Sequence, residues 1–222
     1  MALFTDRRAA GRELAAELAE WRGTDVVVLG IARGGVVVAA AVAEALGLDL
    51  DAVVVRKLGA AGHEEFAVGA IADGVRIVTP DAMRWAGMSS EDLERVEAAE
   101  RAELARRTDM YGPHALDLTG RPALVVDDGV ATGASAVAAC RAVRARGPNR
   151  VVLAVPVAPD RFVPPVDVVD EYVCPHRESD FWAVGEYYDH FGQTGDAEVL
   201  RLLRAASTGS ATGDGPWTGD GP

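Results

Sequence analysis

Short apolar runs alternate along the chain with amphipathic or alanine-rich segments. A run of a few apolar residues ended by Gly or by charge is typical of a strand buried on both faces of a parallel sheet. The predicted strands are residues 25–30, 51–56, 75–78, 122–128, 151–157 and 168–173. The predicted helices are residues 3–21, 36–46, 89–107 and 135–146. This alternation predicts an α/β fold with a doubly wound, mainly parallel central sheet.

Two segments lack this pattern. Residues 57–74 hold Gly59, Gly62, Gly69 and Gly74 and show little periodicity, which predicts a long, partly mobile loop with room for a short hairpin. From Thr208 onward the chain is mostly Gly, Thr, Ser, Asp and Pro, a composition that buries too little surface to order itself. We therefore expect one domain over residues 1–207, followed by a disordered tail over 208–222.

Composition and charge narrow the function. The chain has 222 residues and a formal net charge of −12, with no basic cluster, so nucleic acid is not an expected partner. The start, Met1 to Arg12, has no apolar signal-peptide core, and no apolar run is long enough for a membrane span. We expect a cytoplasmic protein in which Cys140 and Cys174 are reduced.

The stretch from Leu124 to Ser135 carries the clearest chemistry. An apolar strand ends in two adjacent carboxylates, Asp127 and Asp128, and a turn of small residues then leads into a helix. Ligands of open α/β sheets lie beyond the carboxyl ends of such strands. The turn offers backbone amides, two hydroxyls and a helix N-terminus, which together form a phosphate cradle. Its residues are Val130, Ala131, Thr132, Gly133, Ala134 and Ser135.

The two acids need a target other than the phosphate, because they repel it. Vicinal hydroxyls donate hydrogen bonds to carboxylates, and hydrated Mg²⁺ is also held by them. Phosphate, diol and metal together describe a ribose 5-phosphate. The alternative is that Asp127 and Asp128 merely end a strand and Thr132-Gly133 merely makes a turn, but the whole pattern in its strand–turn–helix context weighs against it.

This stretch resembles the phosphoribosyl-pyrophosphate motif of type I phosphoribosyltransferases. The resemblance implies phosphoribosyl pyrophosphate and a small-molecule acceptor as substrates and Mg²⁺ as the cofactor. It also implies that Asp127 and Asp128 are catalytic and metal-binding. A small hood over the sheet and a homodimer are expected from the family alone.

Two further segments resemble the same family. Gly30 to Gly35 resembles its pyrophosphate loop, which implies a catalytic Arg33 and substrate contacts at Gly34 and Gly35. Arg56-Lys57 resembles the basic pair that faces pyrophosphate, which implies a substrate contact at Arg56 and a catalytic Lys57. Taken alone, the first is also a common packing turn and the second a pair of surface cations.

The segment from Pro175 to Phe191 is rich in aromatic and acidic residues. With the opening Phe4 to Gly11, it resembles a bacterial subfamily of uncharacterised phosphoribosyltransferases, and the likeness spans roughly residues 3–205. It implies a cover over the acceptor pocket, in which rings stack on a planar acceptor. A packing hairpin or a contact between subunits is an equal alternative. The rings concerned are Phe181, Trp182, Tyr187 and Tyr188.

No general base stands out. Family members that act on 6-oxopurines place an Asp where this chain has Ala131, so that substrate class loses support. The candidates elsewhere are His63, Glu64, Glu65, Glu186 and Asp189, while His114, His176 and His190 form no recognisable ligand set. We expect a phosphoribosyltransferase. The alternatives are a non-catalytic phosphoribosyl-ligand sensor on the same fold and, more weakly, a hydrolase of phosphoribosyl pyrophosphate or a ribonucleotide.

Overall fold

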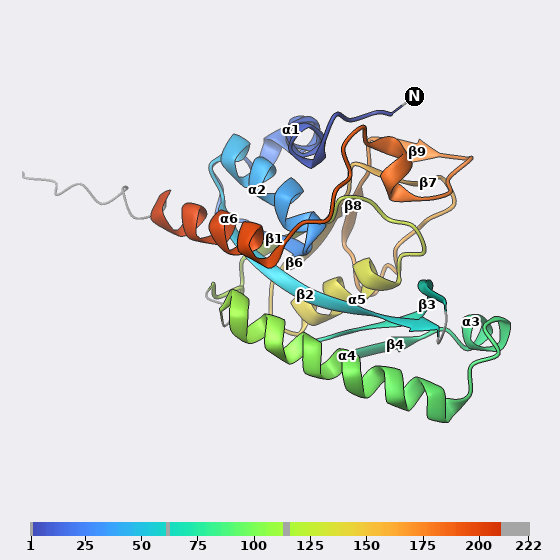
Figure 1. The fold of residues 1–222 in the computed structure, drawn as a ribbon. Coiled ribbons are helices and arrows are strands. Elements are labelled where there is room, and N and C mark those ends of the chain that lie inside the picture. Colours follow the sequence, from blue (N-terminus) through green and yellow to red (C-terminus); the bar gives the residue numbers. More distant parts are fainter. Residues whose placement is uncertain (1, 61–62, 113–115, 210–222) are drawn as a thin grey trace, which may run out of the picture.

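A computed structural model describes residues 2–60, 63–112 and 116–209. Its main sheet has seven strands in the order β4-β3-β2-β1-β5-β6-β8 (Figure 1). Strands β2, β1, β5, β6 and β8 pair in parallel, and β3 and β4 add an antiparallel edge, which confirms the expected α/β fold. The strands are β1 (Val27–Ala32), β2 (Asp49–Ala60), β3 (His63–Ala72), β4 (Val75–Val78), β5 (Pro122–Val126), β6 (Arg150–Ala154) and β8 (Glu171–Val173).

Helices cover both faces of the sheet. Alternate residues of a strand face opposite sides: Val28 and Leu124 pack in the cluster that α2 covers, whereas Leu29 and Val125 pack in the cluster that α5 covers. Helix α4 covers β2 and β3 through Leu93 and Leu104. The helices are α1 (Arg7–Glu17), α2 (Gly34–Leu46), α3 (Pro80–Trp85), α4 (Ser90–Tyr111), α5 (Ala134–Arg144) and α6 (Asp196–Gly209), with a short 3-10 helix η1 (Ala19–Trp21).

The order of the strands places a topological switch point between β1 and β5. These strands are neighbours in the sheet, with Gly30 opposite Val126. The chain leaves β1 through α2 toward β2, and it leaves β5 through α5 toward β6 on the other side. In open α/β sheets, ligands generally bind at such a point, outside the carboxyl ends of the two strands.

The long loop expected over residues 57–74 is wrong for most of its length. Strand β2 runs to Ala60 and pairs antiparallel with β3. Leu58 and Ile71 are fully buried in the cluster under α4, and this packing outweighs the glycine content. Gly69 serves close packing, because a Cβ there would lie 3.1 Å from Val78 Cα. Residues 61–62 lie outside the described residues, so mobility at the hairpin tip stays a prediction.

Several element boundaries also differ from expectation. The first helix begins at Arg7, after Asp6 caps it by accepting a hydrogen bond from the Ala9 amide at 2.8 Å. The apolar run 151–157 is divided, since β6 ends at Ala154 and Val157 starts another strand. Helices α3 and α6 were not predicted. Helix α6 reaches residue 209, inside the expected tail, and residues 210–222 lie outside the described residues.

A small second layer lies over one end of the sheet. The hood consists of β7 (Val157–Pro159), β9 (His176–Glu178), which pairs with it, and residues 179–192 with the 3-10 helix η2 (Val184–Tyr187). The N-terminal segment lies beside it (Figure 1): the Phe4 amide donates to the Tyr187 carbonyl at 2.9 Å, and the His190 amide donates to the Thr5 carbonyl at 2.9 Å. Across the described ranges, none of the helices has the length and apolarity needed to span a bilayer.

Candidate functional site

Asp127 and Asp128 directly follow β5, at the switch point between β1 and β5. Asp127 Oδ1 accepts a hydrogen bond from the Asp128 amide at 2.9 Å. Asp128 Oδ2 accepts one from Arg7 Nε at 2.7 Å, and only 15% of its side-chain surface is exposed. The two adjacent carboxylates are therefore largely withdrawn from solvent, and the Asp128 carboxylate is anchored to the first turn of α1.

Burial governs the ionisation of the pair. It raises the pKa of Asp127 well above its usual value, the neighbouring charge of Asp128 raises that pKa further, and Lys57 and Arg7 oppose both effects only in part. Burial also raises the pKa of Asp128, against the charge and hydrogen bond of Arg7. The pair thus has more negative charge than its surroundings neutralise. A cation or several hydroxyl donors at this position would relieve the excess.

Mg²⁺ fits this carboxylate pair. It is usually held by one or two carboxylates, with water and substrate phosphates completing its shell. In the described part of the chain, no three His, Cys, Asp or Glu side chains gather as a metal site. Asp127 and Asp128 would therefore supply only part of the coordination, as expected for an ion that arrives with a phosphorylated substrate.

The turn before α5 presents unused amides. No side chain caps the helix, and Gly133 at its N-cap has the left-handed φ of 84° that favours glycine. Within the residues that the structure describes, the amides of 131–136 donate no hydrogen bond. Ala131 and Thr132 are exposed, while the Val130 amide anchors the turn by donating to the Val157 carbonyl at 3.0 Å. Amides at a helix N-terminus make a binding site for a phosphate.

The glycines after β1 allow α2 to begin against the acids. A Cβ on Gly35 would lie 2.7 Å from the Val126 carbonyl oxygen and 2.8 Å from Asp127 Oδ1. A Cβ on Gly34 would collide with the Asp128 carboxylate. The peptide between Ala32 and Arg33 is cis. Because Gly34 and Gly35 leave no room for a side chain, the loop between β1 and α2 packs directly against the acid pair. A larger residue at either position would push the two apart.

The three predicted basic residues lie in different places. Lys57 is exposed, and its charge lowers the pKa of both acids, so it belongs to their surroundings. Arg56, its neighbour on β2, instead pairs with Glu100 of α4 at 2.6 Å. Arg33 Nη1 lies 3.6 Å from Asp196 Oδ1 of α6. The structure thus brings Lys57 toward the acids, and it directs the guanidinium groups of Arg33 and Arg56 to other partners.

The hood brings aromatic residues toward this end of the sheet. Tyr188 is buried, and its hydroxyl donates to the Asp128 carbonyl at 2.5 Å. The Tyr187 ring stacks on Phe181 with centroids 5.1 Å apart, whereas Trp182 is 87% exposed. Of the four predicted acceptor-stacking rings, Trp182 is open to a ligand, Phe181 and Tyr187 stack on each other, and Tyr188 is buried.

Sequence reasoning missed the contacts that three residues make near the acids. Arg7 belongs to the opening motif but had no role assigned, although it binds Asp128. Tyr188 was considered only as a ring for the acceptor, and its hydroxyl instead fixes the backbone after β5. Phe162 had no signal in the sequence, and its ring lies against Gly133 of the turn. Contacts between segments this far apart in the chain leave no local pattern.

The candidate bases remain unassigned. Glu186 and Asp189 are exposed in the hood. The side chains of His63, Glu64 and Glu65 and all of His114 lie outside the described residues. His176 Nε2 lies 2.5 Å from Glu13 Oε1, and His190 is exposed.

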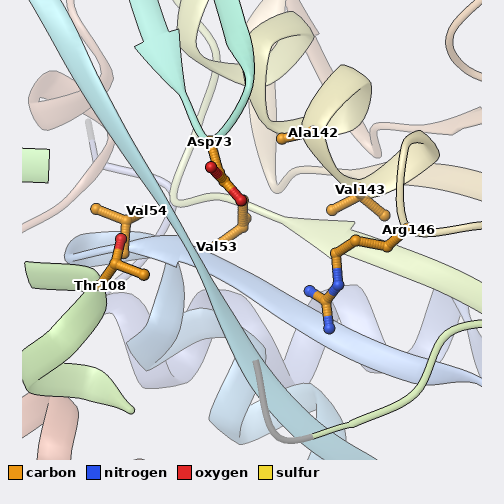
Figure 2. A pocket seen from close by; sticks show the side chains of 7 residues that line it. All are labelled: Val53, Val54, Asp73, Thr108, Ala142, Val143 and Arg146. Carbon is orange, nitrogen blue, oxygen red and sulfur yellow. The ribbon is translucent and has the colours of Figure 1, made fainter. Parts of the chain in front are cut away.

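Two hollows lie away from the acids. One is an open depression on α3 beside Asp81, Arg84 and Trp85. Figure 2 shows the other, whose sticks come from β2, the β3–β4 turn, α4, α5 and the segment just after α5. Its lining residues are Val53, Val54, Asp73, Thr108, Ala142, Val143 and Arg146. None of the predicted site residues lines either hollow.

Comparison with known proteins gives a consistent result. The model of the phosphoribosyl transferase domain matches residues 4–190. A protein of Mycobacterium tuberculosis H37Rv named "Putative phosphoribosyl transferase" is 47% identical over 210 residues, which cover 93% of this chain and 47% of that protein. The same values hold for its counterpart in strain CDC 1551. The chain thus spans about half the length of the curated relatives it matches.

Solved structures agree at the level of the fold. The crystal structure of TT1426 from Thermus thermophilus is 44% identical, with a TM-score of 0.69, and the match covers 91% of this chain and 98% of that one. A hypothetical protein from Neisseria gonorrhoeae, solved with bound ppGpp, is 16% identical with a TM-score of 0.50. That match covers 92% of this chain and 96% of the other.

Proposed function

The chain belongs to the phosphoribosyl transferase domain family, and on this basis we propose that it transfers the 5-phosphoribosyl group from phosphoribosyl pyrophosphate to a small-molecule acceptor. The observation that carries the proposal is the combination of unused amides at the start of α5 with the adjacent acids Asp127 and Asp128. Amides suit the 5-phosphate, and carboxylates suit the ribose hydroxyls, which donate hydrogen bonds.

The reaction breaks the bond between the anomeric carbon and the pyrophosphate oxygen, which leaves with the electron pair. A nucleophilic atom of the acceptor forms the new bond to that carbon, and its proton passes to solvent. Charge separates in the transition state, positive on the sugar ring and negative on the leaving group. The protein therefore contributes mainly by positioning the reactants and by stabilising these charges.

Each site residue has a place in this scheme. The turn of residues 131–135 holds the 5-phosphate, and Asp127 and Asp128 orient the ribose. Lys57 faces the pyrophosphate with its positive charge. Asp127 and Asp128 would hold Mg²⁺ together with the substrate, and the ion would supply positive charge opposite the leaving pyrophosphate. The hood limits access of water, and the exposed Trp182 ring offers a stacking surface for a planar acceptor.

Arg33 needs a rearrangement to contribute. Its guanidinium lies 3.6 Å from Asp196, a long ion pair that is 30% exposed on the arginine side. A pyrophosphate carries more charge than one carboxylate and accepts two parallel hydrogen bonds from a guanidinium. Arg33 can therefore exchange Asp196 for the leaving group. Arg56 has no such route, because it faces α4.

The test is incubation of the protein with phosphoribosyl pyrophosphate, Mg²⁺ and a panel of bases and small nucleophiles. We expect release of pyrophosphate that depends on one acceptor and requires Mg²⁺. Tight binding without release for any acceptor would favour a sensor on the same fold. Release that needs no acceptor would indicate hydrolysis. The cytoplasmic location and the homodimer expected from the family remain predictions.

A further inference from the structure

Arg7 occupies a position that helix formation does not favour. It is the first residue of α1, where the helix dipole is positive and a cation is unfavourable, and the first turn contains no acid. Only 12% of its side-chain surface is exposed, so the guanidinium is also largely desolvated. A buried cation in this place requires compensation from outside its own helix.

That compensation comes from two distant parts of the chain. Arg7 Nε donates to Asp128 Oδ2 at 2.7 Å, and its Nη1 donates to the Gly192 carbonyl at 2.7 Å. The guanidinium carbon also lies 3.9 Å from the centroid of the Phe191 ring, a cation–π contact. One side chain therefore joins the acid after β5 to the end of the hood.

The pair of Arg7 and Asp128 also supports the loop after β1. A Cβ on Gly34 would lie 2.9 Å from Arg7 Nε and would collide with the Asp128 carboxylate. Within the described residues, Asp128 Oδ1 accepts no hydrogen bond from another residue, whereas Oδ2 is held by Arg7. One oxygen is thus fixed and the other remains available to a ligand.

We propose that Arg7 is a positioning residue of the phosphoribosyl site. It fixes the Asp128 carboxylate so that Oδ1 receives the ribose hydroxyl, and it fastens the hood over the same carboxylate. This inference rests on the proposed function, because it assigns the ribose to Asp128. A lysine in this position keeps the charge but cannot bond Oδ2, reach the Gly192 carbonyl and stack on Phe191 at once.

The test is calorimetric titration of phosphoribosyl pyrophosphate with Mg²⁺ into Arg7→Ala, Arg7→Lys and wild type. We expect Arg7→Ala to weaken binding by about tenfold or more, the loss associated with a charge-assisted hydrogen bond. Arg7→Lys should recover part of that loss. Arg8→Ala is the matched control: it removes the next arginine of the same turn, which is 43% exposed and lies 3.8 Å from Glu44, and it should bind within about twofold of wild type.

A purely structural role gives a different result. It would lower the unfolding temperature of Arg7→Ala without changing the affinity of the folded protein. The distinction is sharpened in an Asp128→Asn background, where Arg7→Ala should have almost no further effect on affinity if it acts through Asp128. If Arg7→Ala does not fold, Arg7→Lys with and without Asp128→Asn decides the same question.

The outcomes separate this inference from the proposed function. Failure of wild type to bind phosphoribosyl pyrophosphate removes the proposed function and this inference with it. Binding by wild type that is unchanged in Arg7→Ala, or losses that simply add in the double variant, overturns the role of Arg7 alone.

Discussion

At the scale of single residues, the ionised carboxylate of Asp127 lowers the stability of the fold. Its carboxylate is buried beside that of Asp128, and both burial and repulsion raise its pKa. A carboxyl group whose pKa is higher in the folded protein than in the unfolded chain lowers the free energy of unfolding once it is ionised. Sites that bind charged ligands commonly accept such a cost.

We expect Asp127→Asn to stabilise the free protein at neutral pH, because it removes a buried negative charge and keeps the shape. A gain of roughly 2–4 °C in unfolding temperature corresponds to about 1 kcal/mol in a protein of this size. The same change should weaken binding of phosphoribosyl pyrophosphate with Mg²⁺. Thermal unfolding and calorimetry measure the two effects.

The sign of the pH dependence follows from the raised pKa. Below pH 3.8, the unperturbed value, Asp127 is protonated in both states, and wild type and Asp127→Asn should be nearly equal in stability. As the pH rises through the higher pKa of the folded state, wild type loses stability relative to the variant. A gap that is instead largest in acid would contradict the assignment of the buried charge.

The sequence predicts site residues that are close together in the chain and misses those whose contacts are remote. The sequence located Asp127, Asp128 and the turn after them, because strand, acids, turn and helix are contiguous. Arg7 and Phe162 could not be found this way, since their contacts depend on how remote segments pack. The partners of Arg33 and Arg56, which are Asp196 and Glu100, were hidden for the same reason.

At the scale of the element, strand β2 places two adjacent cations on opposite sides of the sheet, next to different partners. Arg56 and Lys57 are adjacent, and adjacent side chains of a strand face opposite sides of the sheet. Arg56 pairs with Glu100 under α4, while Lys57 lies on the side of the acids. Because β2 continues through Lys57 instead of ending in the expected loop, the two side chains point to opposite sides of the sheet.

This arrangement predicts different effects for two similar substitutions. Lys57→Met should weaken binding of phosphoribosyl pyrophosphate by about tenfold, since it removes a charge near the pyrophosphate. Arg56→Met should leave the affinity unchanged and lower the free energy of unfolding by about 1 kcal/mol, because Glu100 loses a partially exposed partner. Calorimetry and denaturant unfolding test the pair; equal losses of affinity would show that both cations face the ligand.

The sequence failed at the hairpin of β2 and β3 for a physical reason. Glycine weakens the signal of a strand, but Gly69 is there because a neighbouring strand passes too close for a side chain. The packing of Leu58 and Ile71 against α4 supplies the stability that local propensity lacks. Local composition therefore indicated a loop where tertiary contacts make a strand.

At the scale of the whole molecule, surface carboxylates determine the response to acid. Hydrogen bonds from Arg106 and Arg107 lower the pKa of Glu103 to about 2. The Tyr111 hydroxyl and Arg106 lower the pKa of Asp196, and Arg76 and Arg101 lower that of Glu97. Such groups add stability above their unfolded pKa values, and this stability is lost as the pH falls through the lower folded values.

We expect the free energy of unfolding to fall as the pH decreases from about 4.5 to about 2, the range between the ordinary and the lowered pKa of Glu103. Denaturant unfolding at a series of pH values measures it. The control is Glu103→Gln, whose difference from wild type should be present at pH 7 and vanish near pH 2. A difference that persists in strong acid would mean that packing, and not charge, is responsible.

The bonds of Arg7 span 121 residues to Asp128 and 185 residues to Gly192. During synthesis the acids leave the ribosome long before the end of the hood does. A nascent chain that ends before residue 192 therefore lacks the hydrogen bond from Arg7 to the Gly192 carbonyl. If Arg7 has the role proposed above, we expect phosphoribosyl pyrophosphate to bind only after this last part of the domain has been synthesised.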